Sequence, residues 1–194
     1  TTLAALGLHR VKVMPNCKPL HILSADELAG YNPRPMRFCI FSRITPTKGI
    51  EDAIKAVSLA NEKAGSTIAT LDLYGNVETC DCSWFDNVKA SMPETVAYRG
   101  KVAFDKSVST LKDYTALLFP TYYPGEGLAG TVIDAFAAGL PIIASDWHDN
   151  ANIITDGKNG FVFPTHDVNR LAEIILDIYK CQDSLVPMKL NCIH

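Results

Sequence analysis

Short, nearly continuous apolar runs alternate along the chain with segments in which apolar residues recur every three or four positions. The runs predict strands at 38–41, 69–74, 96–100, 116–119, 142–144 and 161–163, with a further short candidate at 11–14. The helically spaced segments predict helices at 50–64, 84–92, 108–112, 131–138, 150–155 and 167–179. Strands that alternate with helices in this way indicate an α/β protein.

The predicted strands are apolar throughout rather than alternating, which is typical of strands covered on both sides. We therefore expect a single Rossmann-like domain, a parallel sheet with right-handed crossovers and helices on both faces. In such sheets ligands bind at the carboxyl ends of the strands. The loops that follow the strands begin at Ser42, Gly75, Gly100, Pro120 and Ser145.

The regular domain is expected at 37–180. Residues 1–36 hold the short strand candidate and a linker punctuated by Gly30, Pro33 and Pro35. Residues 181–194 are expected to be a truncated C-terminal segment, because no closing element is evident there. The chain starts without Met, so we expect an excised piece of a longer protein.

Composition narrows the class of protein. The chain has 194 residues, is 47% hydrophobic and carries a net charge of −3. This composition is typical of a globular protein. The net charge lacks the excess of basic residues that nucleic-acid-binding proteins carry. No apolar run approaches the ~18 residues of a membrane span. Six cysteines include no CxxC pair, and Cys80 and Cys82 lack a matching ligand pair. Reduced thiols are expected, ahead of disulfides or a metal site, and the compartment is expected to be reducing.

Charged residues occur in two of the loops that follow strands. Arg43 and Lys48 lie in the first, and a guanidinium fork with an ammonium suits a pyrophosphate. Glu126 lies in a glycine-rich loop after the fourth strand. The alternative for all three is an ordinary solvated loop position.

A solvent-exposed surface position does not readily explain Asp134. It lies inside a predicted helix among Val132, Ile133, Ala135 and Phe136, so its carboxylate needs a partner or a cleft. The amides of residues 128–131 would form the amino end of that helix, where the macrodipole favours a phosphate.

Together these segments resemble the C-terminal, donor-binding half of retaining glycosyltransferases of the GT-B fold, family 4. The matching motifs follow the family order from about residue 11 to residue 180. They are Val13–Asn16, Phe41–Gly49, Leu73–Gly75, Tyr98–Val102, Pro120-Thr121, Glu126–Asp134 and Asp156–Phe161. The resemblance implies that residues 37–180 bind a nucleotide-sugar, that a hexose is transferred from a UDP- or GDP-sugar, and that no metal or other cofactor is essential.

The resemblance also implies roles for individual residues. Arg43 and Lys48 would neutralise the donor diphosphate, and Glu126 would contact the hydroxyls of the donor sugar as the first acid of the E-x7-E motif. Asp134, the second acid, would contact the ribose; it is one methylene shorter than the family's glutamate, and Ser42 replaces a common glycine. Backbone amides of Leu128, Ala129, Gly130 and Thr131 would face sugar or phosphate, and the backbone at Lys101 and Val102 would contact the base.

Other candidates have simpler explanations. His148 lies in a loop without a serine or cysteine neighbour at recognisable spacing, which favours an ordinary loop histidine. Four aromatic residues are more readily explained by packing than by stacking against a sugar: Trp84, Phe85, Tyr122 and Tyr123. Of these, the two tyrosines are the better candidates for stacking against a sugar.

The expected protein is the donor half of a cytoplasmic enzyme of polysaccharide synthesis, with a nucleotide-sugar and an N-terminal acceptor domain as partners. The intact enzyme could contact the inner face of the membrane peripherally. A non-catalytic nucleotide-sugar module and a GT-B sugar-nucleotide epimerase remain as alternatives. The piece alone is expected to bind nucleotide weakly and to transfer nothing.

Overall fold

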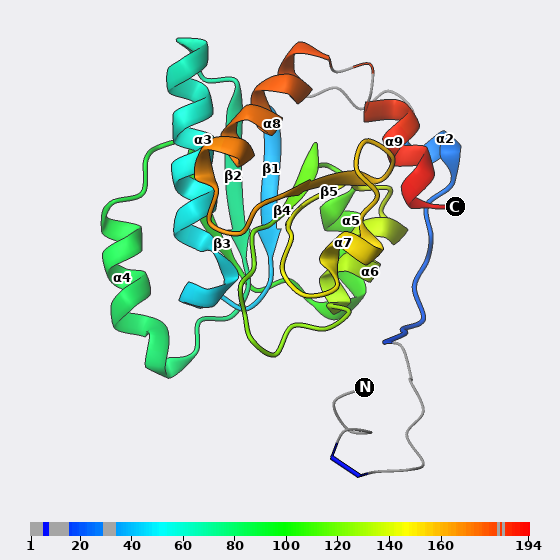
Figure 1. The fold of residues 1–194 in the computed structure, drawn as a ribbon, viewed down its shortest axis with the longest axis horizontal. Helices are drawn as coiled ribbons and strands as arrows, with labels where there is room; N and C mark the ends of the chain where they lie inside the picture. The colour runs from blue at the N-terminus through cyan, green and yellow to red at the C-terminus, as the bar shows by residue number, and fades with distance from the viewer. Residues whose placement is uncertain (1–5, 8–15, 29–33, 182, 184) are drawn as a thin grey trace.

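A six-stranded parallel sheet forms the centre of the molecule in the computed structural model, which describes residues 6–7, 16–28, 34–181, 183 and 185–194. Its strand order is β3-β2-β1-β4-β5-β6. The strands are β1 (Met36–Phe41), β2 (Ala69–Tyr74), β3 (Val96–Gly100), β4 (Ala116–Phe119), β5 (Ile142–Ser145) and β6 (Gly160–Phe163). The predicted α/β fold, a Rossmann-like parallel sheet, is thus confirmed (Figure 1).

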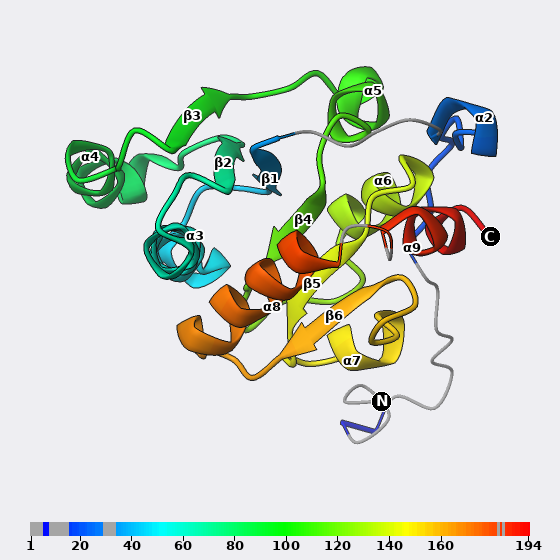
Figure 2. The ribbon, with the colours of Figure 1, turned by 90° about the horizontal axis from the view of Figure 1, so that it is seen from above.

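Helices cover both faces of the sheet (Figure 2). One apolar layer joins the sheet to α3 (Ile50–Ala64), α4 (Cys82–Ala90) and α8 (Val168–Lys180). The opposite layer joins it to α5 (Ser107–Leu111), α6 (Gly130–Ala137), α7 (Asn150–Ile153) and α9 (Leu185–Cys192). Two-sided cover is the physical reason why the strand sequences are almost entirely apolar.

Strand β1 lies between β2 and β4, where the direction of winding changes. Phe38 pairs with Leu71 on one side and with Ala116 on the other. The crossovers after β1 and β4 leave on opposite faces, so the loops that follow these two strands diverge and leave a crevice. The N-terminal end of α6 lies at this switch point.

Two short α-helices in the described part of the chain were not predicted. Within the expected linker, α2 (Ala25–Leu28) forms a single turn, and Leu28 is buried against Gly139, where a Cβ atom would come within 2.5 Å of Leu28 Cδ1. At the other end α9 forms, although its apolar residues are poorly segregated to one face. Tertiary packing rather than local pattern stabilises both. The strand candidate at 11–14 lies outside the described residues.

Candidate functional site

A cleft of ≈ 500 Å³ opens at the carboxyl ends of β1, β2 and β3, facing the N-terminal end of α6. Its lining combines three cations, one carboxylate and several small residues. These residues are Lys18, Phe41, Ser42, Arg43, Tyr74, Gly75, Asn76, Lys101, Val102, Phe104, Gly130, Thr131 and Asp134. Six of the ten predicted site residues therefore line one cavity, and an excess of positive charge favours an anionic ligand.

Lys48 and Glu126 form a buried ion pair beside the cleft. Lys48 Nζ lies 2.5 Å from Glu126 Oε2, and the side chains are 8% and 7% exposed. From the sequence alone, both could have been ordinary solvated loop residues. Their burial and pairing exclude that interpretation. Arg43, by contrast, is exposed at the cleft.

Tyr123 connects the ion pair to the cleft. Its ring centroid lies 4.9 Å from Lys48 Nζ and 5.3 Å from Arg43 Cζ. An aromatic face attracts cations, so the Tyr123 ring stabilises both positive groups. Arg43 and Lys48 thus both lie against the ring of Tyr123, although only Arg43 lines the cleft.

The loop that carries Glu126 is fixed by two hydroxyl groups to which the sequence analysis assigned no role. Thr121 follows β4 and donates its hydroxyl to Glu126 Oε2 at 2.6 Å. Ser145, at the end of β5, donates to the carbonyl oxygen of Thr121 at 2.6 Å. The sequence places Thr121 in the loop that begins at Pro120, but only the structure shows that its side chain contacts Glu126.

Gly49 fixes the position of Lys48. It ends the 3-10 turn η1 (Pro46–Lys48) and begins α3, with a φ of 69°. A Cβ atom here would lie 2.1 Å from the carbonyl oxygen of Pro120. Only glycine therefore allows the loops after β1 and β4 to approach so closely.

Asp134 is buried, as its helical neighbours predicted, and it has a partner. Lys18 Nζ lies 2.6 Å from Asp134 Oδ2, while Oδ1 is buried without a hydrogen-bond partner. Thr131 Oγ1, one turn earlier, is also buried without a partner. The sequence analysis missed Lys18 because it lies in the segment assigned to the linker.

The remaining predicted residues surround the N-terminal end of α6 and the end of β3. Ala129 is the N-cap residue of α6, and its backbone is extended. Lys101 and Val102 follow β3 on the far side of the cleft. Leu128 is absent from the lining of the cleft; it lines a second cavity instead.

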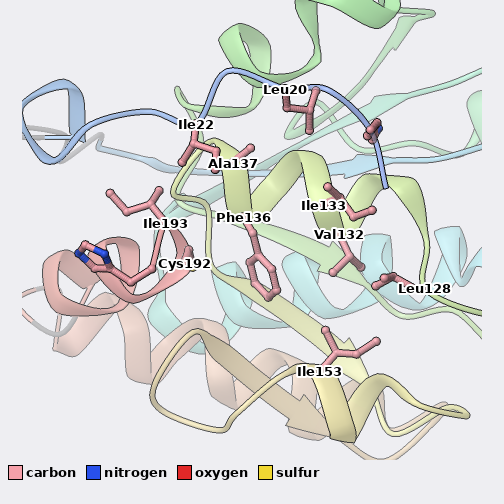
Figure 3. A pocket seen from close by; sticks show the side chains of 12 residues that line it. Leu20, Ile22, Leu128, Val132, Ile133, Phe136, Ala137, Ile153, Cys192 and Ile193 are labelled. Carbon is pink, nitrogen blue, oxygen red and sulfur yellow. The ribbon is translucent and has the colours of Figure 1, made fainter. Parts of the chain in front are cut away.

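This second cavity is an apolar groove of ≈ 510 Å³ along the outer side of α6, and it shares Lys18 with the cleft. Figure 3 shows Phe136 pointing from α6 toward Ile153, with Leu20 and Ile22 on the N-terminal segment that passes over the helix. The groove thus separates α6 from α7 and the end of α9.

A tyrosine network continues from the cleft into the sheet. Tyr74 lines the cleft, and its hydroxyl lies 2.8 Å from the hydroxyl of Tyr114, which donates to Asp72 at 2.7 Å. Burial alone would raise the pKa of Asp72, but hydrogen bonds from Tyr114, Arg99 and Arg37 outweigh it and lower that pKa. Burial raises the pKa of Tyr114, so its hydroxyl stays a hydrogen-bond donor.

The other aromatic candidates and His148 pack against protein groups. Phe85 is buried in the core, and Trp84 Nε1 lies 3.4 Å from Glu51 Oε2. The ring of Tyr122 lies 4.3 Å from that of His166, and burial raises the pKa of Tyr122. His148 Nε2 lies 3.2 Å from the carbonyl oxygen of Pro124.

All six cysteines are free thiols in the structure. Across residues 6–7, 16–28, 34–181, 183 and 185–194, no three His, Cys, Asp or Glu side chains gather as a metal site would require. In the same part of the chain, no helix has the length and apolar character needed to cross a membrane.

A sheet of this order, with cations and a carboxylate around a helix N-terminus at its switch point, defines a Rossmann-like site for an anionic ligand. The family model described as "Glycosyl transferases group 1" matches residues 35–181. The chain belongs to this family of glycosyltransferases.

Individual relatives have low sequence identity to this chain, but they too are named glycosyltransferases. The poly(glycerol-phosphate) α-glucosyltransferase of Bacillus subtilis is 26% identical over 145 residues, which cover 73% of this chain and 20% of that protein. The amylovoran biosynthesis glycosyltransferase AmsK of Erwinia amylovora is 24% identical over 81% of this chain and 39% of its own length. The chain thus spans well under half of either relative.

Solved structures share the fold. HepE of Anabaena, crystallised with UDP and glucose, superposes with a TM-score of 0.73 at 18% identity, covering 89% of this chain and 47% of that one. The C-terminal domain of the group 1 glycosyl transferase LpcC of Francisella tularensis superposes with a TM-score of 0.69 at 18% identity, covering 83% and 84%. These similarities show a GT-B type of Rossmann-like domain.

Proposed function

We propose that this chain is the donor-binding half of a retaining glycosyltransferase of family 4 that moves a hexose from a UDP- or GDP-sugar to a saccharide or lipid-linked acceptor. The observation that carries the proposal is the cleft, in which Arg43 and Lys101 lie with Asp134 near the N-terminal end of α6. A nucleoside diphosphate joined to a sugar offers two negative charges to the cations and hydroxyls to the carboxylate.

In the proposed reaction the departing diphosphate gains negative charge as the bond to the sugar breaks. Arg43, Lys48 and the backbone amides at Ala129 and Gly130 would stabilise this charge, which is electrostatic catalysis. Lys48 is preorganised for that role because Glu126 and the ring of Tyr123 hold it. Glu126 keeps a second carboxylate oxygen with which to accept from sugar hydroxyls.

The names of similar proteins support the donor class. HepE was crystallised with UDP-glucose, and a similar mannosyltransferase of Mycobacterium tuberculosis is described as GDP-mannose-dependent. The similarity to an isolated C-terminal domain supports the assignment to the donor half. The acceptor half would then be N-terminal in the same protein, which would act in surface polysaccharide synthesis in the cytoplasm, at or near the inner membrane face.

Calorimetric titration of the chain with UDP, GDP and ADP tests the proposal. One nucleotide should bind, and the Arg43→Ala/Lys48→Ala double variant should lose at least about tenfold in affinity, since each removes a charge-assisted contact. The matched control is Lys55→Ala/Lys63→Ala, which removes two exposed lysines of α3. Equal affinity in the two double variants would contradict the proposed site.

Activity of the protein that includes the acceptor half separates the alternatives. Glu126→Ala should abolish sugar transfer in an enzyme and have no catalytic consequence in a non-catalytic module. Release of nucleotide and altered sugar without any acceptor would instead identify an epimerase. The isolated chain should transfer nothing above buffer.

A further inference from the structure

We propose that Lys18 is a positioning residue of the donor site: it holds one oxygen of Asp134 so that the other oxygen accepts hydrogen bonds from the ribose hydroxyls of the nucleotide. This inference rests on the proposed function. It adds a residue from outside the sheet domain to the machinery that recognises the donor.

The two oxygens of Asp134 have different surroundings. Oδ2 lies 2.6 Å from Lys18 Nζ, and the side chains of Lys18 and Asp134 are 13% and 6% exposed. Oδ1 is buried, has no hydrogen-bond partner, and belongs to a residue that lines the cleft. A buried carboxylate oxygen without a donor costs free energy, and a ligand with hydroxyl groups would remove that cost.

Thr131 points to the same conclusion. Its Oγ1 atom is also buried without a partner, and Thr131 lines the cleft one turn before Asp134. A hydroxyl can both donate and accept. Two unsatisfied polar atoms on one face of α6 therefore match a ligand that carries adjacent hydroxyls, such as a ribose.

The segment that carries Lys18 is attached to α6 at both ends. Asn16 Nδ2 donates to the carbonyl oxygen of Leu128 at 3.2 Å, just before the helix. Leu23 N donates to the carbonyl oxygen of Ala137 at 2.9 Å, at its last residue. Figure 3 shows the intervening segment passing over α6, with Leu20 and Ile22 directed toward the groove. Contacts on both sides of Lys18 in the sequence therefore hold its segment against α6.

The residues around the ammonium group fit this position. The ammonium group lies directly beside the start of α6, because Lys18 Nζ is only 3.4 Å from the position of a Cβ atom on Gly130. The ring centroid of Phe104 lies 5.0 Å from Nζ, within the range of a cation–π contact. A cation at a helix N-terminus opposes the macrodipole, and the short contact with Asp134 offsets this repulsion.

The test compares a nucleoside diphosphate that binds the protein with its 2′,3′-dideoxy analogue, which lacks the ribose hydroxyls. In the wild type the ribonucleotide should bind about tenfold more tightly, since hydrogen bonds to a charged group are lost in the analogue. Lys18→Met should remove most of this preference while changing the affinity for the dideoxy analogue less than about twofold. Lys18→Arg should restore part of it, and the control Lys55→Met should leave it unchanged.

The ratio of the two affinities is measured within each variant, so a partial loss of folded protein cancels. Equal weakening of both ligands in Lys18→Met would overturn the inference, because Lys18 would then act on the phosphates or on the fold. An unchanged preference would overturn it as well. Failure of the wild-type protein to bind any nucleoside diphosphate would instead overturn the proposed function on which the inference rests.

Discussion

Lys48 Nζ and Glu126 Oε2 lie 2.5 Å apart although the residues are 78 positions apart in the sequence. The loop after β1 supplies one residue and the loop after β4 supplies the other. Their pairing joins the two loops that diverge at the switch point of the sheet. The pair is therefore a structural link between these loops, and it lies beside the cleft that we propose as the donor site.

We expect Glu126→Gln to destabilise the protein by about 3 kcal/mol, because Lys48 is then buried without a counter-charge. Urea unfolding followed by circular dichroism measures the loss. The double variant Lys48→Met/Glu126→Leu should be closer to the wild type than the sum of its single changes, since it removes both charges. Additive losses would show that the two side chains do not interact.

Gly49 and Gly65 provide a matched pair of glycines with φ angles of 69° and 68°. A Cβ atom on Gly65 meets nothing within 4 Å, whereas one on Gly49 would overlap the carbonyl oxygen of Pro120. Gly65→Ala should cost about 1 kcal/mol from backbone strain alone, and Gly49→Ala about 3 kcal/mol or more because the loops must separate. Equal losses in thermal unfolding would refute the role of close approach.

Tyr123 should act through its ring rather than its hydroxyl. Tyr123→Phe keeps the face that contacts Arg43 and Lys48, so nucleotide affinity should stay within about twofold of the wild type. Tyr123→Leu removes both cation–π contacts and should weaken binding about two- to fivefold. Titration with the nucleoside diphosphate measures both, and a larger effect of Tyr123→Phe would assign the role to the hydroxyl.

Lys189 should make stability depend on pH. Burial lowers its pKa from 10.5 to about 8, although its ammonium donates to the carbonyl oxygen of Tyr114 at 3.1 Å. Between pH 8 and 10.5 the unfolded chain binds more protons at this lysine than the folded one, so its contribution to the free energy of unfolding rises with pH. Below pH 8 the full cost of burying the charge remains.

Lys189→Met removes this dependence. The free energy of unfolding of the variant minus that of the wild type should therefore decrease by about 2–3 kcal/mol from pH 7 to pH 10. Burial also raises the pKa of Cys192 to about 12, but that thiol is present in both proteins and its effect largely cancels in the difference. Chemical unfolding at several pH values measures the difference, and a constant value would show that Lys189 titrates normally.

The sequence predicted the elements whose local pattern agrees with their final environment. Helix α3 has apolar residues at helical spacing and ends at Gly65, and all six strands appeared within one or two residues of the predicted bounds. Helix α9 could not be predicted, because its buried residues include Lys189 as well as Met188 and Cys192. Its formation depends on the apolar layer against which it packs.

For the site, the sequence by itself determined which loops carry the charged residues. It also indicated that Asp134 is not an ordinary solvent-exposed residue. The periodicity of each element is a local property, and an alternation of strands and helices predicts a parallel sheet, in which Arg43, Lys101 and the N-terminal end of α6 follow strands at one edge. Only the tertiary structure decided the partners: Lys48 with Glu126, Lys18 with Asp134, and Tyr123 between two cations. Such contacts join residues far apart in the chain, and no local pattern encodes the distance between their side chains.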